Sequence, residues 1–130
     1  MKLHRLLAST FTCIAITSCA QTPPAADEAE SARLARELRT LIGPANCSAD
    51  TQCRTVPVGA KACGGPAGYW AWSTNGIDEA RVADLATRQS AAHRREIAAS
   101  GMQSNCAITV DPGAACVTGR CQLATPASAR

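Results

Sequence analysis

Apolar residues recur at helical spacing in two segments of the chain. The first segment, residues 27–42, carries a stripe of Leu34, Leu38, Leu41 and Ile42. Asp27 is placed to cap its first turn, with Glu30 completing a capping box, and Gly43 with Pro44 ends it. The pattern therefore predicts an N-terminal helix over residues 27–42 with one face to bury, against the rest of the domain or against a partner.

The second helical segment covers residues 78–100, with Asn75 or Asp78 as its cap and Gly101 as its stop. When the residues are projected around a helix at 100° per residue, the mostly apolar residues fall on one face and several arginines fall on the opposite face. The mostly apolar face consists of Val82, Leu85, Ala86, Gln89, His93 and Ile97. We therefore expect His93 to lie on the core side of this helix.

Short apolar runs between turn residues predict strands elsewhere. Residues 53–58 and 67–73 form one pair of runs, and Pro57 indicates an edge strand because proline cannot donate to a ladder. Residues 106–110 and 115–123 are predicted as further strands, joined by the turn residues 111–113, and Thr118-Gly119 can turn a small hairpin. The fold class predicted is α+β, with an antiparallel sheet of about four strands packed on one or two helices.

Residues 1–18 have the composition of an export signal. Lys2 and Arg5 precede an uncharged, mostly apolar stretch that is too short to span a membrane. The sequence Ile16-Thr17-Ser18-Cys19 resembles the lipobox of bacterial lipoproteins, in which the cysteine is lipidated and becomes the new N-terminus. The resemblance covers the first 19 residues and implies lipidation of Cys19. The proline-containing residues 19–26 are predicted to form a tether, residues 27–124 a domain and residues 125–130 a flexible tail. Ordinary signal cleavage beside Ser18-Cys19-Ala20 is the alternative, and it would release a soluble periplasmic protein.

Lipidation makes the bilayer the first expected partner, because buried acyl chains anchor a protein without any transmembrane helix. Ala20, rather than an aspartate, follows the cysteine, and by resemblance to Gram-negative lipoproteins this favours the outer membrane, with the domain facing the periplasm. After removal of residues 1–18 the chain carries 11 basic and 10 acidic residues. This balance lacks the basic excess of a nucleic-acid-binding protein.

Six cysteines remain in the domain, and they are expected to form three disulfides in an oxidising compartment. They are Cys47, Cys53, Cys63, Cys106, Cys116 and Cys121. Fifteen pairings are possible. A Thr118-Gly119 turn would set Cys116 opposite Cys121, so these two could bridge each other, or both could point inward to reach Cys47 and Cys53. Disulfides suit this chain because Leu, Ile, Val and Phe make only 14 of residues 19–130, which is a thin core.

The sequence offers little catalytic or metal chemistry. The cysteines have neither Cys-x-x-Cys nor zinc-finger spacing, so no metal site is predicted and no cofactor is implied. His93 is the only histidine after processing, and its place on an apolar helix face favours a core or rim role over general-base catalysis. The glycine-rich run 64–68 lacks the residues of a phosphate-binding loop. No catalytic residue is assigned, and we do not expect an enzyme.

Two surfaces are candidates for binding. The first is the loop with Gly64, Gly65 and Pro66, followed by Tyr69; Trp70 and Trp72 share the opposite strand face, where they form either the core or a binding surface. The second is a row of arginines seven residues apart on the exposed helix face, which could meet lipid phosphates or an acidic partner unless it is an ordinary solvated face. These are Arg81, Arg88 and Arg95.

Cys-x5-Cys followed by Cys-Gly-Gly-Pro and an aromatic strand is similar to small uncharacterised cysteine-rich bacterial lipoproteins, a resemblance that implies no activity. The function predicted is that of a non-catalytic protein-binding module tethered in the cell envelope and directed at an envelope or exported protein. Inhibition of an exported hydrolase is its candidate role. A structural envelope accessory that docks through its helices is the alternative, and an enzyme of unassigned class is the third.

Overall fold

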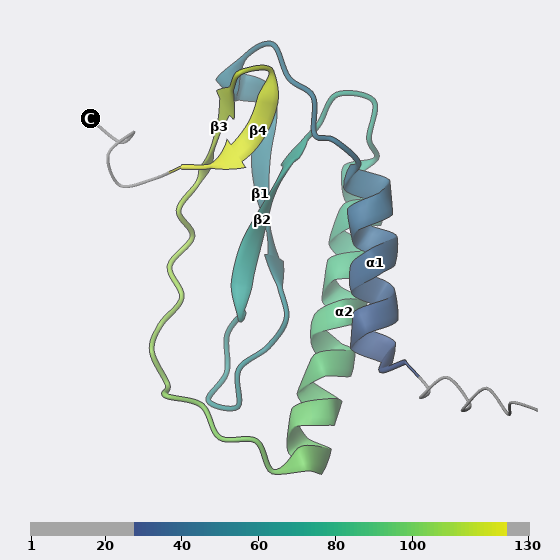
Figure 1. Ribbon diagram of the computed structural model, residues 1–130, viewed down its shortest axis with the longest axis vertical. Helices are drawn as coiled ribbons and strands as arrows, with labels where there is room; N and C mark the ends of the chain where they lie inside the picture. The colour runs from purple at the N-terminus through teal and green to yellow at the C-terminus, as the bar shows by residue number, and fades with distance from the viewer. Residues whose placement is uncertain (1–27, 125–130) are drawn as a thin grey trace, which may run out of the picture.

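The computed structural model describes residues 28–124. In Figure 1 two helices, α1 and α2, form one layer, and the β1–β2 ladder forms the second layer beside them. A small β3–β4 hairpin sits over one end of the ladder, and an extended segment leads to it from the end of α2 along the side away from the helices. The predicted signal peptide, Cys19, the tether, Asp27 and the C-terminal tail lie outside the described residues.

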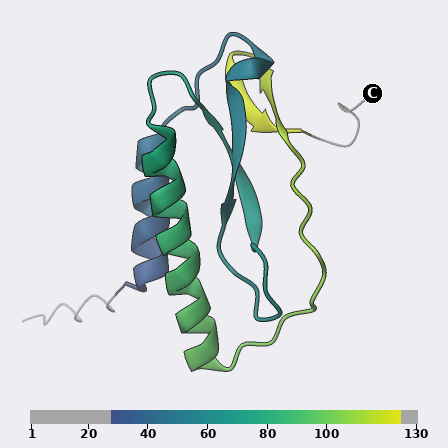
Figure 2. The same ribbon diagram turned by 180° about the vertical axis from the view of Figure 1, so that it is seen from behind.

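The helix layer follows from the periodicity of the sequence. α1 runs over Glu30–Ile42 and buries Leu34, Leu38 and Ile42 as predicted. α2 runs over Glu79–Ser100, where the Asp78 carboxylate accepts hydrogen bonds from the backbone N–H groups of the first turn. The two helices pack side by side, and their apolar faces meet the ladder (Figures 1 and 2).

α1 differs from the prediction at its start. Ala29, not Asp27, occupies the N-cap position and makes no side-chain capping bond. Glu96 of α2 supplies the cap instead: its carboxylate accepts from the backbone N–H of Ser31 at 2.9 Å and from the Ser31 hydroxyl. A carboxylate suits this place because the free N–H groups of a helix N-terminus attract negative charge.

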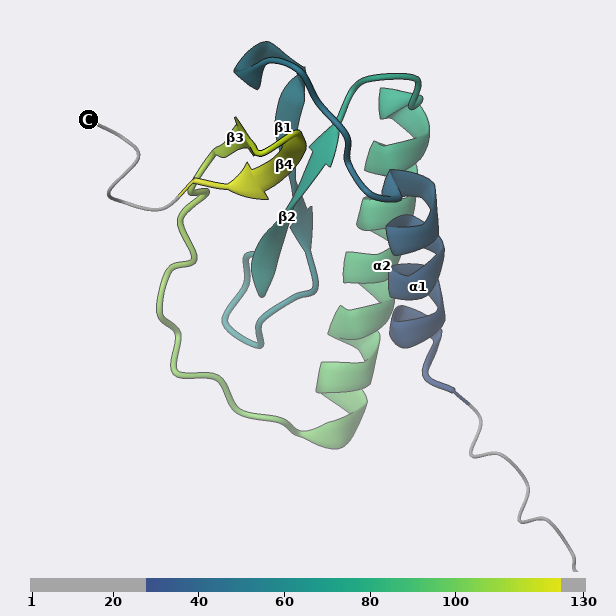
Figure 3. The ribbon, with the colours of Figure 1, turned by 45° about the horizontal axis from the view of Figure 1, so that its top comes forward.

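The four strands form two sheets, which corrects the prediction of one four-stranded sheet. β1 (Cys53–Val58) pairs antiparallel with β2 (Gly68–Ser73), and β3 (Ala114–Val117) pairs with β4 (Arg120–Leu123). The hairpin turn has positive φ at Thr118 and Gly119, as a two-residue turn of this kind requires. Figure 3 shows the hairpin crossing the end of the ladder rather than continuing it.

The predicted strand over residues 106–110 is wrong. No residue from 102 to 113 pairs in a sheet, and we call this segment the strap. In all three ribbon views it runs along the face of the ladder opposite to the helices (Figures 1 to 3). Its Ala-Ile-Thr-Val sequence favours extended backbone, but the segment lies over the face of the ladder and its backbone pairs with neither strand.

The ladder places its aromatic residues toward the helices. Register pairs Val56 with Trp70 and Arg54 with Trp72, so these side chains share a face. Trp72 is buried in the core, and Trp70 is half-buried with the Arg39 guanidinium of α1 at 4.0 Å from its ring. The two tryptophans are therefore packing residues, and the opposite face of the ladder, toward the strap, remains for other contacts.

Candidate protein-binding surface

The strap is fastened to the body of the domain at three places. A disulfide joins Cys106 to Cys63, in the loop that connects β1 to β2. The ammonium group of Lys61, in the same loop, donates to the carbonyl oxygen of Ala107. At the far end the Thr55 hydroxyl of β1 donates to Asp111 Oδ2 at 2.6 Å. The residues between Ala107 and Asp111 are thereby held between two fixed points.

These central strap residues present apolar side chains and unpaired backbone to solvent. Ile108 is 90% exposed and Val110 is 76% exposed, the highest values among the large apolar residues of the described chain. Within residues 28–124, the backbone groups of Ile108, Thr109 and Val110 form no hydrogen bonds. A contiguous exposed apolar segment with free backbone groups is the kind of surface that marks a protein contact.

The loop that carries Cys63 is itself supported from α2. Gln89 Oε1 accepts from the backbone N–H of Gly59 at 2.7 Å, and His93 Nδ1 accepts from the N–H of Ala60 at 3.0 Å. Gly59 has φ +68°, and an added Cβ would lie 2.8 Å from the Cβ of Ala67. His93 thus sits on the core side of α2, as predicted, with its Nδ1 occupied as an acceptor.

The predicted binding loop is exposed at Gly64 and Gly65, while Pro66 is half-buried. Tyr69 is half-buried on the strap side of the ladder, opposite Pro57 in register. The Cys63–Cys106 disulfide brings this loop and the strap into one surface. Sequence analysis identified the loop but predicted a strand where the strap lies. The run Ala-Ile-Thr-Val over residues 107–110 marks this segment in the sequence, but nothing in the run shows that it stays unpaired and exposed.

The predicted arginine row is exposed but mostly ion-paired. Arg88 Nη1 lies 3.5 Å from Asp84 Oδ2, and Arg95 Nη2 lies 2.8 Å from Glu30 Oε2. Arg81 has no ion pair among residues 28–124. Pairing with carboxylates on the same two helices neutralises much of the row, which makes it a solvated helix face more than an anion site.

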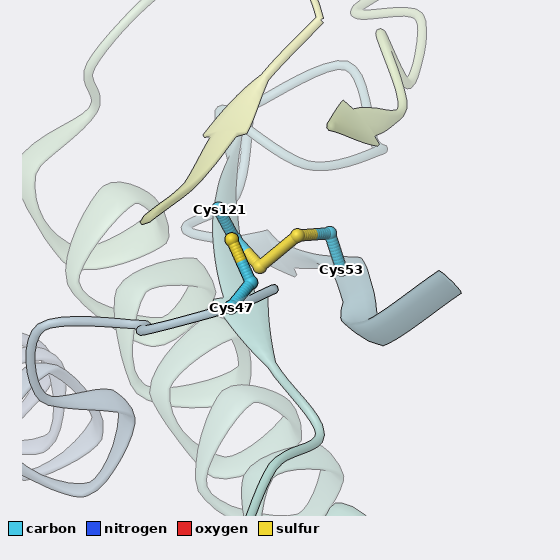
Figure 4. A group of neighbouring side chains, drawn as sticks. All are labelled: Cys47, Cys53 and Cys121. Carbon is cyan, nitrogen blue, oxygen red and sulfur yellow. A yellow bond between two sulfur atoms is a disulfide. The ribbon is translucent and has the colours of Figure 1, made fainter. Parts of the chain in front are cut away.

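The disulfides at the hairpin follow the inward-pointing alternative. Cys116 and Cys121 lie opposite each other in register but bond to Cys47 and Cys53 respectively. Figure 4 shows Cys47 beside the Cys53–Cys121 bridge, and the three sulfur atoms lie within 4.8 Å of one another. All three sulfurs are consumed in disulfides, so the group offers no thiolate to a metal ion.

One carboxyl group of the described chain titrates away from its ordinary range. The hydrogen bond from the Ser31 hydroxyl, and after it the bond from the Ser31 backbone N–H, hold the pKa of Glu96 below its usual value. The positive charge of Arg95 acts in the same direction, and desolvation opposes these effects. The role of Glu96 is to cap α1, because both of its oxygens are used there.

Comparison with protein-family models, with curated proteins and with solved structures finds no match to this chain. No helix among residues 28–124 is both long enough and apolar enough to cross a membrane.

Proposed function

We propose that this protein is a lipid-anchored, non-catalytic binding module of the bacterial cell envelope. The lipobox resemblance at Cys19 supports the anchor and, with Ala20, an outer-membrane location facing the periplasm. Three disulfides within residues 47–121 suit an oxidising compartment. The domain is the part that meets a partner protein.

One observation carries the proposal: the apolar centre of the strap is exposed while both of its ends are fastened. A segment that is already held extended loses little conformational entropy on binding. Less of the favourable free energy of its contacts is therefore spent on ordering the segment, and its affinity for a partner is higher. The loop around Gly64 and Gly65 extends the same surface through the Cys63–Cys106 disulfide.

We further propose that the partner is an exported hydrolase, and that the strap enters its cleft as an inhibitor does. Endopeptidases are the hydrolases to test first, because their clefts receive substrate chains in extended form through backbone hydrogen bonds and alternate side-chain pockets. The free backbone groups of residues 108–110 and the side chains of Ile108 and Val110 match both requirements.

The test uses the exported chain with Cys19→Ser, which removes the lipid and leaves the domain intact. It is titrated against a panel of endopeptidases purified from the same envelope, and residual activity gives the inhibition constant. Burial of an isoleucine or valine contributes about 1.5–3 kcal/mol, so Ile108→Asp and Val110→Asp are each expected to weaken inhibition about 10- to 100-fold.

Val117→Asp is the matched control, because Val117 is also an exposed valine, at 44%, but lies on β3 outside the strap. It is expected to leave inhibition unchanged. Equal inhibition by the Ile108→Asp, Val110→Asp and parent proteins would remove the strap from the proposal. Absence of inhibition across the panel would remove the hydrolase as partner.

A further inference from the structure

A groove of about 560 Å³ lies between β1 and α2, within the size range of ligand sites. Figure 2 shows the side on which these two elements face the viewer, in front of α1 and β2. The β1 wall includes Val56 and Pro57, the α2 wall includes Val82, Ala83 and Ala86, and Pro66 of the loop contributes to the lining. The groove borders the strap surface at Thr55 and at the loop residues Gly65 and Pro66, but no residue of the strap lines it.

The outer edge of β1 offers backbone groups to this groove. Residue pairs of an antiparallel ladder alternate between hydrogen-bonded and non-hydrogen-bonded. The Thr74 N–H donates to the carbonyl oxygen of Gln52, so residues 52 and 74 form a hydrogen-bonded pair. The next residue, Cys53, directs its N–H to the Asp50 carbonyl oxygen, away from β2. By alternation, Cys53, Thr55 and Pro57 occupy the non-hydrogen-bonded pairs. The backbone groups of Thr55 and the carbonyl of Pro57 therefore point away from β2.

Two residues limit this open edge to a short length. Arg54 Nη1 donates to the carbonyl oxygens of Thr51 and Cys53, each at 2.9 Å, and so occupies the edge at one end. At the other end Pro57 has no N–H to donate. What remains open is the N–H and carbonyl of Thr55 and the carbonyl of Pro57, enough for three backbone hydrogen bonds to an added strand.

The charges of the residues that line the groove indicate which side chains an added strand carries. Arg54 and Arg94 line the groove with Glu79 as the only acidic lining residue. Arg94 forms no ion pair among residues 28–124. An acidic side chain on a bound segment would meet this unpaired guanidinium beside an apolar wall, where a charge-assisted hydrogen bond is stronger than in open water.

We propose that the groove binds an extended, acidic segment of a partner protein, which adds as a strand to the edge of β1. Its backbone pairs with Thr55 and Pro57, an apolar side chain lies against the exposed Pro57 ring and Ala83, and a carboxylate meets Arg94. This is strand addition between a sheet edge and a helix. Ile108 and Val110 do not line the groove, so a substitution at either residue tests the strap proposal without altering the groove.

The experiment selects phage-displayed random linear heptapeptides on the Cys19→Ser chain and measures each selected peptide by fluorescence anisotropy. Ala83→Trp fills the groove from an exposed helix position that tolerates a large side chain. Ala99→Trp is the control, since Ala99 is exposed on the same helix and does not line the groove. Thermal melts establish that both variants fold.

We expect selected peptides rich in Asp or Glu and β-branched residues that bind Ala83→Trp at least tenfold more weakly than Ala99→Trp. The ¹⁵N amide resonance of Thr55 shifts on their addition, Arg94→Glu reverses the preference to basic peptides, and Ile108→Asp leaves binding unchanged. Equal binding to the two tryptophan variants, recovery of no peptide above background, or a tight self-dimer that occupies the groove would each overturn the proposal.

Discussion

Gly59 is where the packing of this domain is most sensitive to a single carbon atom. Its φ of +68° is costly for any residue with a Cβ, about 1–2 kcal/mol. The added Cβ would also lie 2.8 Å from the Cβ of Ala67 and 3.2 Å from His93 Nδ1, and neither neighbour is the end of a flexible chain. Forced overpacking of this kind costs a further 1–3 kcal/mol or so.

Gly59→Ala is therefore expected to lower the free energy of unfolding by about 2–5 kcal/mol. Gly101→Ala is the matched control, because Gly101 has nearly the same φ, +65°, and nothing within 4 Å of its added Cβ. Its expected loss is about 1–2 kcal/mol, from backbone conformation alone.

Urea unfolding followed by tryptophan fluorescence measures both losses. The two variants differ by the overpacking cost of about 1–3 kcal/mol. With a slope of about 1–2 kcal/mol per M, this difference corresponds to roughly 0.5–3 M in the midpoint. Equal midpoints would refute the reasoning, because they would mean that Ala67 and His93 do not confine Gly59. A Gly59→Ala protein that is unfolded in water while Gly101→Ala folds would support it.

Three further predictions follow from the same contacts. The pKa of Glu96 is lower in the folded protein than its unfolded value of about 4.5, so the ionised carboxylate stabilises the fold above that pH. This stabilisation is lost as the pH falls through the folded pKa. Glu96→Gln should therefore flatten the acid limb of a plot of melting temperature against pH between about 5 and 3. Gln89→Leu leaves the buried N–H of Gly59 without its acceptor and should lower the free energy of unfolding in urea by about 1–3 kcal/mol. If Gln89→Met has the same unfolding midpoint as the parent protein, this hydrogen bond does not stabilise the fold. Replacement of Cys63 and Cys106 by alanine should remove roughly 2–4 kcal/mol and speed amide exchange in the strap, and unchanged exchange there would show that the disulfide does not fix it.

The sequence predicted correctly those elements whose own residues show, by their apolar spacing, which face is buried. Helical periodicity located α1 and α2, and Asp78 marked the start of α2 correctly. The α1 cap could not be found this way, because it comes from Glu96, 65 residues away. Local pattern describes which face is buried, but not which distant side chain completes a helix end.

The same limit applies to the strap. Residues 106–110 have strand propensity, and propensity does not say whether a neighbouring edge exists. The disulfide to Cys63 and the hydrogen bond to Asp111 hold this segment along the outer face of the ladder, where its backbone pairs with no strand. The disulfide pairing fixes this arrangement, and six cysteines allow fifteen pairings that the sequence does not distinguish. The sequence did suggest, as one of two alternatives, that Cys116 and Cys121 reach Cys47 and Cys53.

The central claim, that the strap is the surface that meets a partner, is tested most directly by photocrosslinking in the cells that make the protein. A benzophenone amino acid replaces Ile108 in the full lipid-anchored chain, and a second variant carries it at Val117 on β3. We expect a discrete crosslinked product at position 108 that is absent at position 117, with an exported hydrolase as the attached protein. No product at position 108, or the same products at both positions, would contradict it.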